Sequence, residues 1–248
     1  LAFQIRDDLF DFGDNKSGKP SGIDIKERKL TLPIIHAFSK ATPSDVRKIK
    51  KLIRLANQYP DIIFSLSAGN EACVDWTDHY VPVQSVINYV KMIKKGAKQP
   101  VTFCENYVPW IDKLKDLVEE VDFISIHTYP VWEYKKIYEA LEYTKSNYYT
   151  IAERYPNKLV IITEAGWATN SNGRGICSSN VSEELQEVYY NDLVDWSLKE
   201  NILTFVFEAF DEPWKGSAEP LEPEKHWGLF TVDRKPKQVM RKLFSNLL

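Results

Sequence analysis

The sequence predicts an α/β protein built on a parallel sheet. After residue 60, short runs of β-branched and apolar residues alternate with longer stretches of helical periodicity, which is the pattern of repeated strand–helix units. The strand-like runs are apolar at consecutive positions, as expected of strands covered on both faces. The chain has 248 residues, of which 44% are hydrophobic and 27% charged, so it can bury a full core.

The expected elements follow one another in a regular order. Strands are predicted at 62–67, 101–104, 123–126, 159–163 and 203–207. Helices are predicted at 82–95, 110–119, 134–155 and 183–201, and a basic amphipathic helix at 44–59 precedes the first strand.

Residues 1–48 have a different character and are predicted to form a separate helical segment before a partial barrel at 49–248. Asp7, Asp8 and Asp11 lie at helical spacing, which can hold Mg²⁺ through several oxygens, although a solvated helix face is the alternative for a lone motif. DDLFD followed by GKPSGIDIKERKLTLP resembles the second aspartate-rich motif of polyprenyl diphosphate synthases. The resemblance implies Mg²⁺ on the aspartates and a diphosphate facing Lys19. It covers residues 1–45 and lacks the family's first aspartate-rich motif, so no complete prenyl transferase site is expected.

Composition excludes several kinds of partner. The net charge is −3 and the pI about 5.9, which gives no electrostatic case for nucleic acid or an anionic membrane. No apolar run reaches membrane-spanning length. Three widely spaced cysteines argue against a disulfide framework or a zinc knuckle and favour unpaired thiols. The first residues lack an initiator Met and a basic n-region, so the chain is expected to begin at a cut end.

Polar residues stand where each predicted strand ends. The carboxyl ends of parallel strands meet at one rim, where barrel enzymes keep their chemistry, so these side chains are expected to converge. A structural ion pair is the alternative for any one of them taken alone. The residues are Glu71, Glu105, His127, Tyr129, Glu164 and Glu212.

Two carboxylates facing each other beside aromatic rings suit glycosidic bond cleavage, because one must donate a proton and the other must attack the anomeric carbon. The motifs also resemble glycoside hydrolase family 17, the β-1,3-glucanases, and most closely its bacterial branch, over about residues 50–246. They are Gly69-Asn70-Glu71, Thr163-Glu164-Ala165-Gly166-Trp167, and Phe210-Asp211-Glu212-Pro213-Trp214-Lys215 ahead of Trp227-Gly228-Leu229-Phe230.

The resemblance implies a role for each matching residue. Glu71 would be the general acid/base, Glu164 the nucleophile of a retaining mechanism, and Asn70 the partner of the sugar 2-hydroxyl. Glu212 and Lys215 would tune charge and position substrate, Tyr129 would lie at the reacting sugar, and Trp167 and Trp227 would border the cleft. The expected substrate is a β-glucan and no cofactor is expected; Mg²⁺ concerns only the N-terminal segment. Retention predicts the two carboxyls about 5–5.5 Å apart, with a raised pKa at Glu71.

Other residues have less specific expectations. Glu105 either supports the site or pairs with a Lys or Arg, and His127 is expected to order hydrogen bonds and not to transfer protons. Glu208 could face the site or the core. Four tryptophans are expected to be packing or surface residues: Trp76, Trp110, Trp132 and Trp196.

The implied fold is a (β/α)₈ TIM barrel with the acid/base after strand four and the nucleophile after strand seven. Three strand–helix units before that point need about 90 residues, and only residues 1–61 precede the first predicted strand. The chain is therefore expected to lack strands one to three, as a truncated, fused or chimeric protein. The alternatives to hydrolysis or transglycosylation are an inactive carbohydrate-binding fragment and a remnant helix that binds prenyl diphosphate and Mg²⁺.

Overall fold

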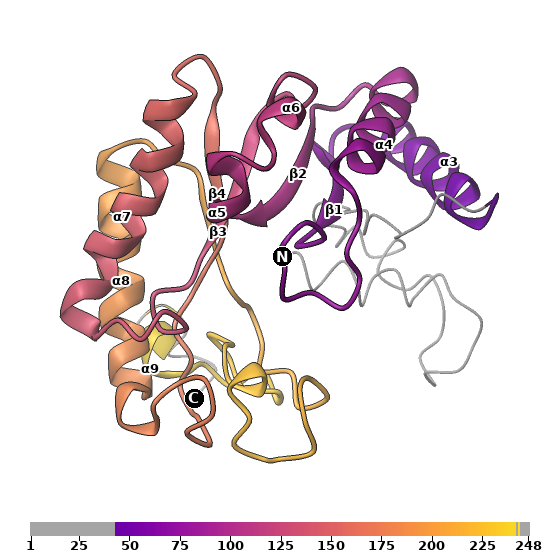
Figure 1. Ribbon diagram of the computed structural model, residues 1–248. Coiled ribbons are helices and arrows are strands. Elements are labelled where there is room, and N and C mark those ends of the chain that lie inside the picture. Colours follow the sequence, from indigo (N-terminus) through magenta and orange to yellow (C-terminus); the bar gives the residue numbers. More distant parts are fainter. Residues whose placement is uncertain (1–42, 242, 244–248) are drawn as a thin grey trace. The chain divides into compact units, whose positions relative to one another are not determined.

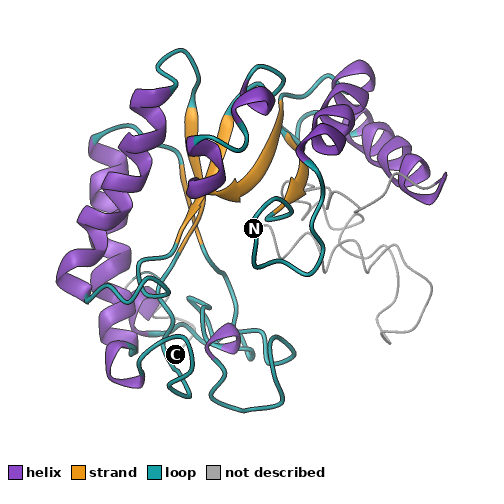
Figure 2. Cartoon of the chain, in the orientation of Figure 1, coloured by secondary structure: helices purple, strands orange, loops and turns teal. Residues whose placement is uncertain are grey.

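The computed structural model describes residues 43–241 and 243 (Figure 1). The predicted metal residues Asp7, Asp8 and Asp11, together with Lys19, lie outside the described residues. The described part of the chain contains five strands in one sheet, in the order β1-β2-β3-β4-β5, with helices between them (Figure 2). The predicted α/β class with five strands is therefore confirmed.

The chain divides into two compact units, and β3 (Ile124–Thr128) carries residues of both. Of the described residues, the first unit contains 43–125 and 154–160, and the second contains 126–153, 161–241 and 243. Helix α3 (Pro43–Gln58) runs without a break across residue 48, where the sequence placed a domain boundary. The proposed division into 1–48 and 49–248 stays a prediction.

The first unit contains two parallel strands with their helices. They are β1 (Leu66–Asn70), α4 (Val83–Gly96), β2 (Val101–Asn106), α5 (Tyr107–Ile111) and α6 (Lys115–Val118), after α3. In α4, Val86, Val90 and Ile93 are buried at helical spacing, which gives the helix one apolar face toward the sheet. Strands β1 and β2 pair in parallel, with Leu66 opposite Val101 and Asn70 opposite Cys104.

Two predicted boundaries in this unit were wrong. The first strand begins at Leu66 and not at Ile62, because α3 ends in a turn in which Tyr59 O accepts the amides of Ile62 at 3.1 Å and Ile63 at 2.9 Å. The strand also ends later than predicted, at Asn70. The helix predicted at 110–119 is two short helices, because the backbone at Asp112 (φ −145°, ψ −47°) leaves the helical region.

The second unit contains the rest of the sheet and two long helices. Its elements are α7 (Ile137–Arg154), β4 (Val160–Ala165), η1 (Ser178–Asn180), α8 (Glu183–Lys199), β5 (Thr204–Val206), η2 (Pro223–Lys225) and α9 (Gln238–Arg241). The last residue of α7 and the first residue of β4 are assigned to the first unit. Strands β4 and β5 pair in parallel, with Ile162 opposite Thr204 and Ala165 opposite Val206. Helix α8 begins at a Ser182 cap, whose hydroxyl accepts the Leu185 amide at 3.1 Å.

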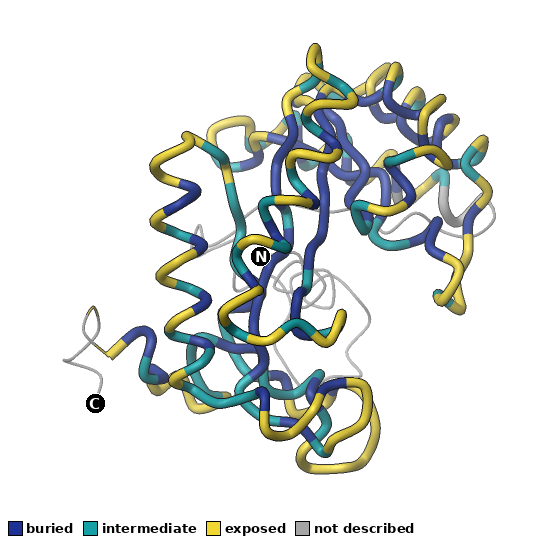
Figure 3. Tube along the Cα trace, turned by 60° about the vertical axis from the view of Figure 1, so that its left-hand side comes forward, coloured by how far each residue is buried: buried dark blue, intermediate teal, exposed yellow. Residues whose placement is uncertain are grey.

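Helices α7 and α8 lie side by side (Figure 1). They contact each other through aromatic and hydroxyl side chains. Tyr148 of α7 meets Trp196 of α8 with ring centroids 5.7 Å apart, and Thr144 shares a 2.8 Å hydrogen bond with Tyr189. Asn147 donates to Thr128 Oγ1 at 2.9 Å, which ties α7 to the end of β3. Buried and exposed residues alternate along the helices (Figure 3). At most one residue in each of β1, β2, β3 and β4 is not buried, whereas β5 is of intermediate exposure.

All three cysteines, Cys73, Cys104 and Cys177, are free, as expected. Within the described part of the chain, no helix is both long enough and apolar enough to span a bilayer.

Candidate active site

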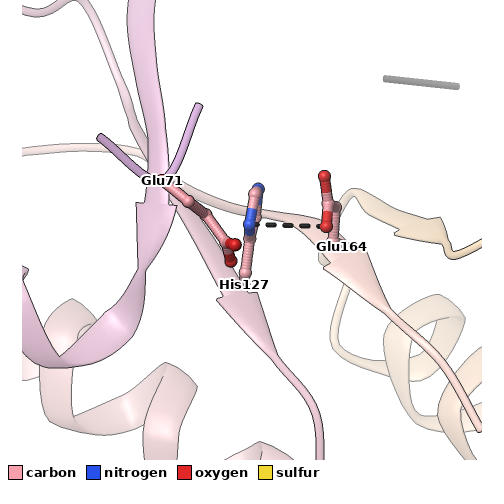
Figure 4. A group of neighbouring side chains, drawn as sticks. All are labelled: Glu71, His127 and Glu164. Atoms are coloured by element: carbon pink, nitrogen blue, oxygen red, sulfur yellow. Dashed lines mark ion pairs between the residues drawn. The ribbon is translucent and has the colours of Figure 1, made fainter. Parts of the chain in front are cut away.

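Glu164 is a buried carboxylate near the end of β4. Its residue is 4% exposed, and its Oε2 accepts a hydrogen bond from the Tyr129 hydroxyl at 2.5 Å. His127 Nδ1 lies 3.5 Å from the same oxygen (Figure 4). Both partners come from the end of β3, where His127 is fully buried and Tyr129 is the first residue after the strand. Two adjacent strand ends thus fix the orientation of one carboxylate.

Tyr129 is itself held by aromatic rings of the second unit. Its ring lies 5.6 Å from Phe207 and 5.1 Å from Trp227, centroid to centroid, in edge-to-face arrangements. Phe207 directly follows β5, and Trp227 lies in the segment after η2. Edge-to-face pairs restrain a ring more than area burial alone does. The hydroxyl of Tyr129 is therefore aimed at Glu164 by packing from two other segments.

Glu71 directly follows β1 in the first unit. Its φ of 45° lies in the left-handed region, which non-glycine residues rarely adopt outside turns and functional sites. The amide of Glu71 donates to Cys104 O of β2 at 3.0 Å, which holds this turn in place. Asn70 Oδ1 is buried with no hydrogen-bond partner among the described residues. A buried carbonyl acceptor usually has a donor, and a ligand hydroxyl would supply one.

Glu105 fixes the loop that follows Glu71. It is fully buried, and its Oε2 accepts the Cys73 amide at 2.7 Å, while its Oε1 accepts the Asn106 amide at 2.8 Å. Burial raises the pKa of the Cys73 thiol to about 12, and the Glu105 carboxylate adds to that shift. Both of these contacts are with backbone amides. Whether Glu105 supports the site or pairs with a Lys or Arg stays a prediction.

Glu212, Lys215 and Glu208 form a buried charge cluster after β5. Lys215 Nζ lies 2.8 Å from Glu212 Oε2 and 3.3 Å from each oxygen of Glu208, and 4.4 Å from the Phe207 ring centroid. Burial raises the pKa of Glu208 to about 9, against the opposing attraction of Lys215, and the Glu212 charge raises it further. At neutral pH Glu208 therefore keeps its proton beside Lys215.

A second ion pair, between the buried Lys237 and the part-buried Asp211, was not anticipated from the sequence. Lys237 Nζ donates to Asp211 Oδ1 at 2.7 Å and to Thr169 Oγ1 at 2.8 Å, and the same Asp211 oxygen accepts the Gly228 amide at 3.0 Å. A Cβ on Gly228 would lie 2.1 Å from Asp211 N, so only glycine fits. Burial raises the pKa of Asp211 and lowers that of Lys237. Nothing in the local sequence of Lys237 marks it, because its partners come from distant loops.

The predicted tryptophans divide by exposure. Trp167 and Trp227 are each 1% exposed, and Trp167 packs on Tyr189 and donates to Asn180 O at 3.0 Å. Packing therefore accounts for Trp167, and the sugar contact expected of it stays a prediction, as does that of Trp227. Trp110 and Trp196 are buried, as expected of packing residues, whereas Trp76 is 67% exposed.

The predicted site residues belong to both units. Asn70, Glu71 and Glu105 lie in the first unit, and the others lie in the second: His127, Tyr129, Glu164, Trp167, Glu212, Lys215 and Trp227. In the second unit Tyr129 and His127 both lie against Glu164. The convergence of the other strand-end residues stays a prediction. The predicted separation of the Glu71 and Glu164 carboxyls and the raised pKa of Glu71 stay predictions.

The chain also resembles a prenyl synthase over a minor part of its length. It is 38% identical over 80 residues to the octaprenyl diphosphate synthase of Escherichia coli, which covers 31% of this chain and 24% of that protein. The resemblance to polyprenyl diphosphate synthases is thus supported, weakly, and Mg²⁺ binding stays a prediction.

Comparison with known proteins places most of the chain among enzymes named for β-1,3-glucans. It is 25% identical over 222 residues to a glucan 1,3-β-glucosidase of Arthroderma benhamiae, covering 84% of this chain and 70% of that protein. An endo-laminarinase from Formosa Hel1_33_131 matches with a TM-score of 0.76 at 28% identity, over 83% of this chain and 64% of that chain. A family 17 β-1,3-glucanosyltransferase from Rhizomucor miehei shares the fold, with a TM-score of 0.67, 24% identity and coverage of 86% and 77%.

A protein-family model also matches the greater part of the sequence. The BtgE/BtgC glycoside hydrolase domain matches residues 21–228, beginning inside the segment that the sequence set apart as helical. The prediction of a glycoside hydrolase is confirmed by this match. The chain belongs to the BtgE/BtgC glycoside hydrolase domain family.

Proposed function

We propose that this protein cleaves or transfers β-1,3-glucosidic bonds in glucans by a retaining mechanism, with Glu164 as nucleophile and Glu71 as acid/base. The observation that carries the proposal is the buried Glu164 carboxylate, oriented by Tyr129 and His127 at the ends of neighbouring strands. The strand-end position is where (β/α) barrel enzymes hold their catalytic groups. The names of the relatives supply the substrate class.

In the first step a Glu164 oxygen attacks the anomeric carbon. The bond from that carbon to the leaving oxygen breaks, and the leaving oxygen takes the proton of Glu71. A lone pair of Glu164 becomes the bond of a neutral ester, and the negative charge passes to Glu71, which has lost its proton. The hydrogen bond from Tyr129 thus shifts from a carboxylate to a weaker acceptor. Tyr129 therefore sets the orientation of the nucleophile before attack.

In the second step the Glu71 carboxylate takes a proton from water or from a sugar hydroxyl, whose oxygen attacks the anomeric carbon. The ester to Glu164 breaks and its carboxylate is regenerated, which returns both groups to their starting protonation states. Water gives hydrolysis and a sugar hydroxyl gives transglycosylation. Two carboxyl groups complete the cycle, so the chemistry requires no cofactor.

The groups around these two residues support binding. The buried Asn70 Oδ1, which has no partner in the part of the chain that the structure describes, would accept a hydroxyl of the reacting sugar. The Glu208, Glu212 and Lys215 cluster fixes the segment after β5 through contacts of 2.8–3.3 Å. Such restraint preserves a pre-organised site, since a misplacement of about 1 Å costs on the order of 100-fold in rate.

The roles of the two carboxylates are tested with the full chain and a soluble β-1,3-glucan such as laminarin. Reducing-sugar release is expected from the wild type, with a loss of at least about 1,000-fold in Glu164→Gln, because the covalent step is lost. Glu153→Gln is the matched control, since Glu153 is exposed on α7 and is expected to retain full activity.

Azide separates nucleophile from acid/base. With an aryl glucoside whose leaving group needs no protonation, Glu71→Ala should still form the glycosyl-enzyme, and azide should trap it as the β-glucosyl azide. In Glu164→Ala, azide should instead attack the substrate directly and give the α-glucosyl azide. Exchanged products would reverse the two assignments. Glucan binding by the wild type without product release would favour the non-catalytic, carbohydrate-binding alternative.

A further inference from the structure

The loop between β1 and α4 begins at Glu71 and has a rigid base. Ala72, Cys73, Val74 and Val81 are each 2% exposed or less. The Val81 amide donates to Ala72 O at 2.7 Å, and the Cys73 thiol donates to Val81 O at 3.2 Å, so the two ends of the loop are fastened together. Glu105 holds the Cys73 amide from β2 at 2.7 Å. The loop therefore leaves the sheet in one defined conformation.

Lys113 clamps the tip of the same loop. Its Nζ lies 2.6 Å from Asp75 Oδ1 and 4.9 Å from the centroid of the Tyr80 ring. The hydrogen bond to Asp75 raises the pKa of Lys113. Asp75 and Tyr80 stand on either side of Trp76 in the sequence. The tip is thus held from both sides by one cation, through an ion pair and a cation–π contact.

Trp76 lies at this clamped tip and is 67% exposed. Among the described residues no hydrogen bond or ring contact involves its indole. Of the two roles expected for Trp76, packing or surface, its exposure shows the surface one. A large apolar ring displayed on a fixed loop loses little conformational entropy when it binds a ligand. The flat indole face suits the apolar face of a pyranose ring, and its polar edge suits a wet surface.

The place of the loop in the chain indicates which sugar it would meet. The general acid delivers its proton to the leaving oxygen, so the sugar that departs lies on the acid's side of the scissile bond. Glu71 is the first residue of the loop that bears Trp76. Building on the function proposed above, we propose that Trp76 binds the glucosyl units on the leaving-group side of the scissile bond.

The same contact bears on transfer against hydrolysis. In the second step an acceptor sugar occupies the position that the leaving sugar vacated, because the reaction retraces its path. Its hydroxyl gives its proton to Glu71 as its oxygen bonds to the anomeric carbon and the ester to Glu164 breaks. Stacking on Trp76 holds the acceptor there and excludes water, so Trp76 favours transfer.

The test compares Trp76→Ala with Trp76→Phe in the full chain on two substrates. For laminari-oligosaccharides, Trp76→Ala is expected to raise KM about tenfold, equivalent to about 1.4 kcal/mol, and to lower the ratio of transfer to hydrolysis products by a similar factor. For an aryl β-glucoside, which has no sugar on the leaving side, kcat/KM is expected to stay within about twofold. Trp76→Phe, which keeps a ring, should recover most of the loss.

The control is Tyr138→Ala, which removes an aromatic ring that is 81% exposed on α7. This substitution should leave the kinetic constants on both substrates unchanged. Equal losses on both substrates in Trp76→Ala, or no change on either, would overturn the inference.

The activity of the wild type separates failure of the proposed function from failure of the inference about Trp76. If it turns over neither substrate, that function fails, and calorimetric titration with laminaripentaose decides the inference. A Kd about tenfold higher in Trp76→Ala than in the wild type would support sugar binding by Trp76. Equal affinity in the two proteins, or no binding by the wild type, rejects it.

Discussion

Replacing Glu208 by glutamine should change how the stability of this protein depends on pH. Glu208 is 3% exposed and faces Lys215, which also pairs with Glu212. Burial raises the pKa of Glu208 from its usual value of 4.5 to about 9. In the folded protein this carboxyl therefore keeps its proton at neutral pH. Glutamine has nearly the same shape and reproduces the neutral state without a titration.

The sign and size of the effect follow from proton linkage. Below pH 4.5 Glu208 is protonated in both the folded and the unfolded chain, so it contributes no pH dependence. Between pH 4.5 and about 9 only the folded chain keeps the proton, so stability falls as pH rises. The fall is about 1.4 kcal/mol for each pH unit. From pH 5 to 8 the wild type should thus lose on the order of 4 kcal/mol relative to Glu208→Gln.

Urea unfolding of both proteins at pH 5, 6, 7 and 8 measures this difference, because all other titrating groups are common to the two chains. A difference in the free energy of unfolding that is constant with pH would mean that Glu208 ionises alike in the folded and unfolded states, and would refute the reasoning. Glu212→Gln provides a second check. Glu212 raises the pKa of Glu208, so without its charge the fall in stability should end at a lower pH.

Two further substitutions test the contacts around the site. Tyr129→Phe removes the 2.5 Å hydrogen bond to Glu164. It should lower kcat on laminarin by about 10- to 100-fold with little change in KM, since a charge-assisted hydrogen bond contributes about 1.5–3 kcal/mol. An unchanged kcat would contradict the orienting role of Tyr129. Lys237→Met leaves the part-buried Asp211 without its cation and should cost about 3 kcal/mol of unfolding free energy by urea titration, the lower end of the range for a broken buried pair. Combining it with Asp211→Asn should restore part of that loss, and a double variant no more stable than Lys237→Met would show that the pair is not the cause.

The strands and their polar ends were predictable because their signals are local. A buried parallel strand reads as a short apolar run, and β4 occupies Val160–Ala165 against a predicted 159–163. Long helices such as α8 were also placed to within two residues, because the cap at Ser182 and the helical periodicity both lie in the local sequence. The first strand was misplaced because Ile62 and Ile63 are as β-prone as the residues that follow them. Only the hydrogen bonds to Tyr59 O show that they belong to a turn.

By itself, the sequence determined the α/β class, the order of the elements and the strand-end positions of Glu71, Tyr129 and Glu164, since apolar patterning and parallel connectivity fix these in advance of any long-range contact. Tertiary structure alone decided the electrostatics and exposure around them. The protonated Glu208 beside Lys215, and the Lys237 cation that joins Asp211 to Thr169, depend on burial and on partners up to 68 residues apart. The exposed Trp76 depends on how Lys113 and Glu105 hold its loop. Charge states and exposure follow from the surroundings of a side chain, and the surroundings exist only once the chain has folded.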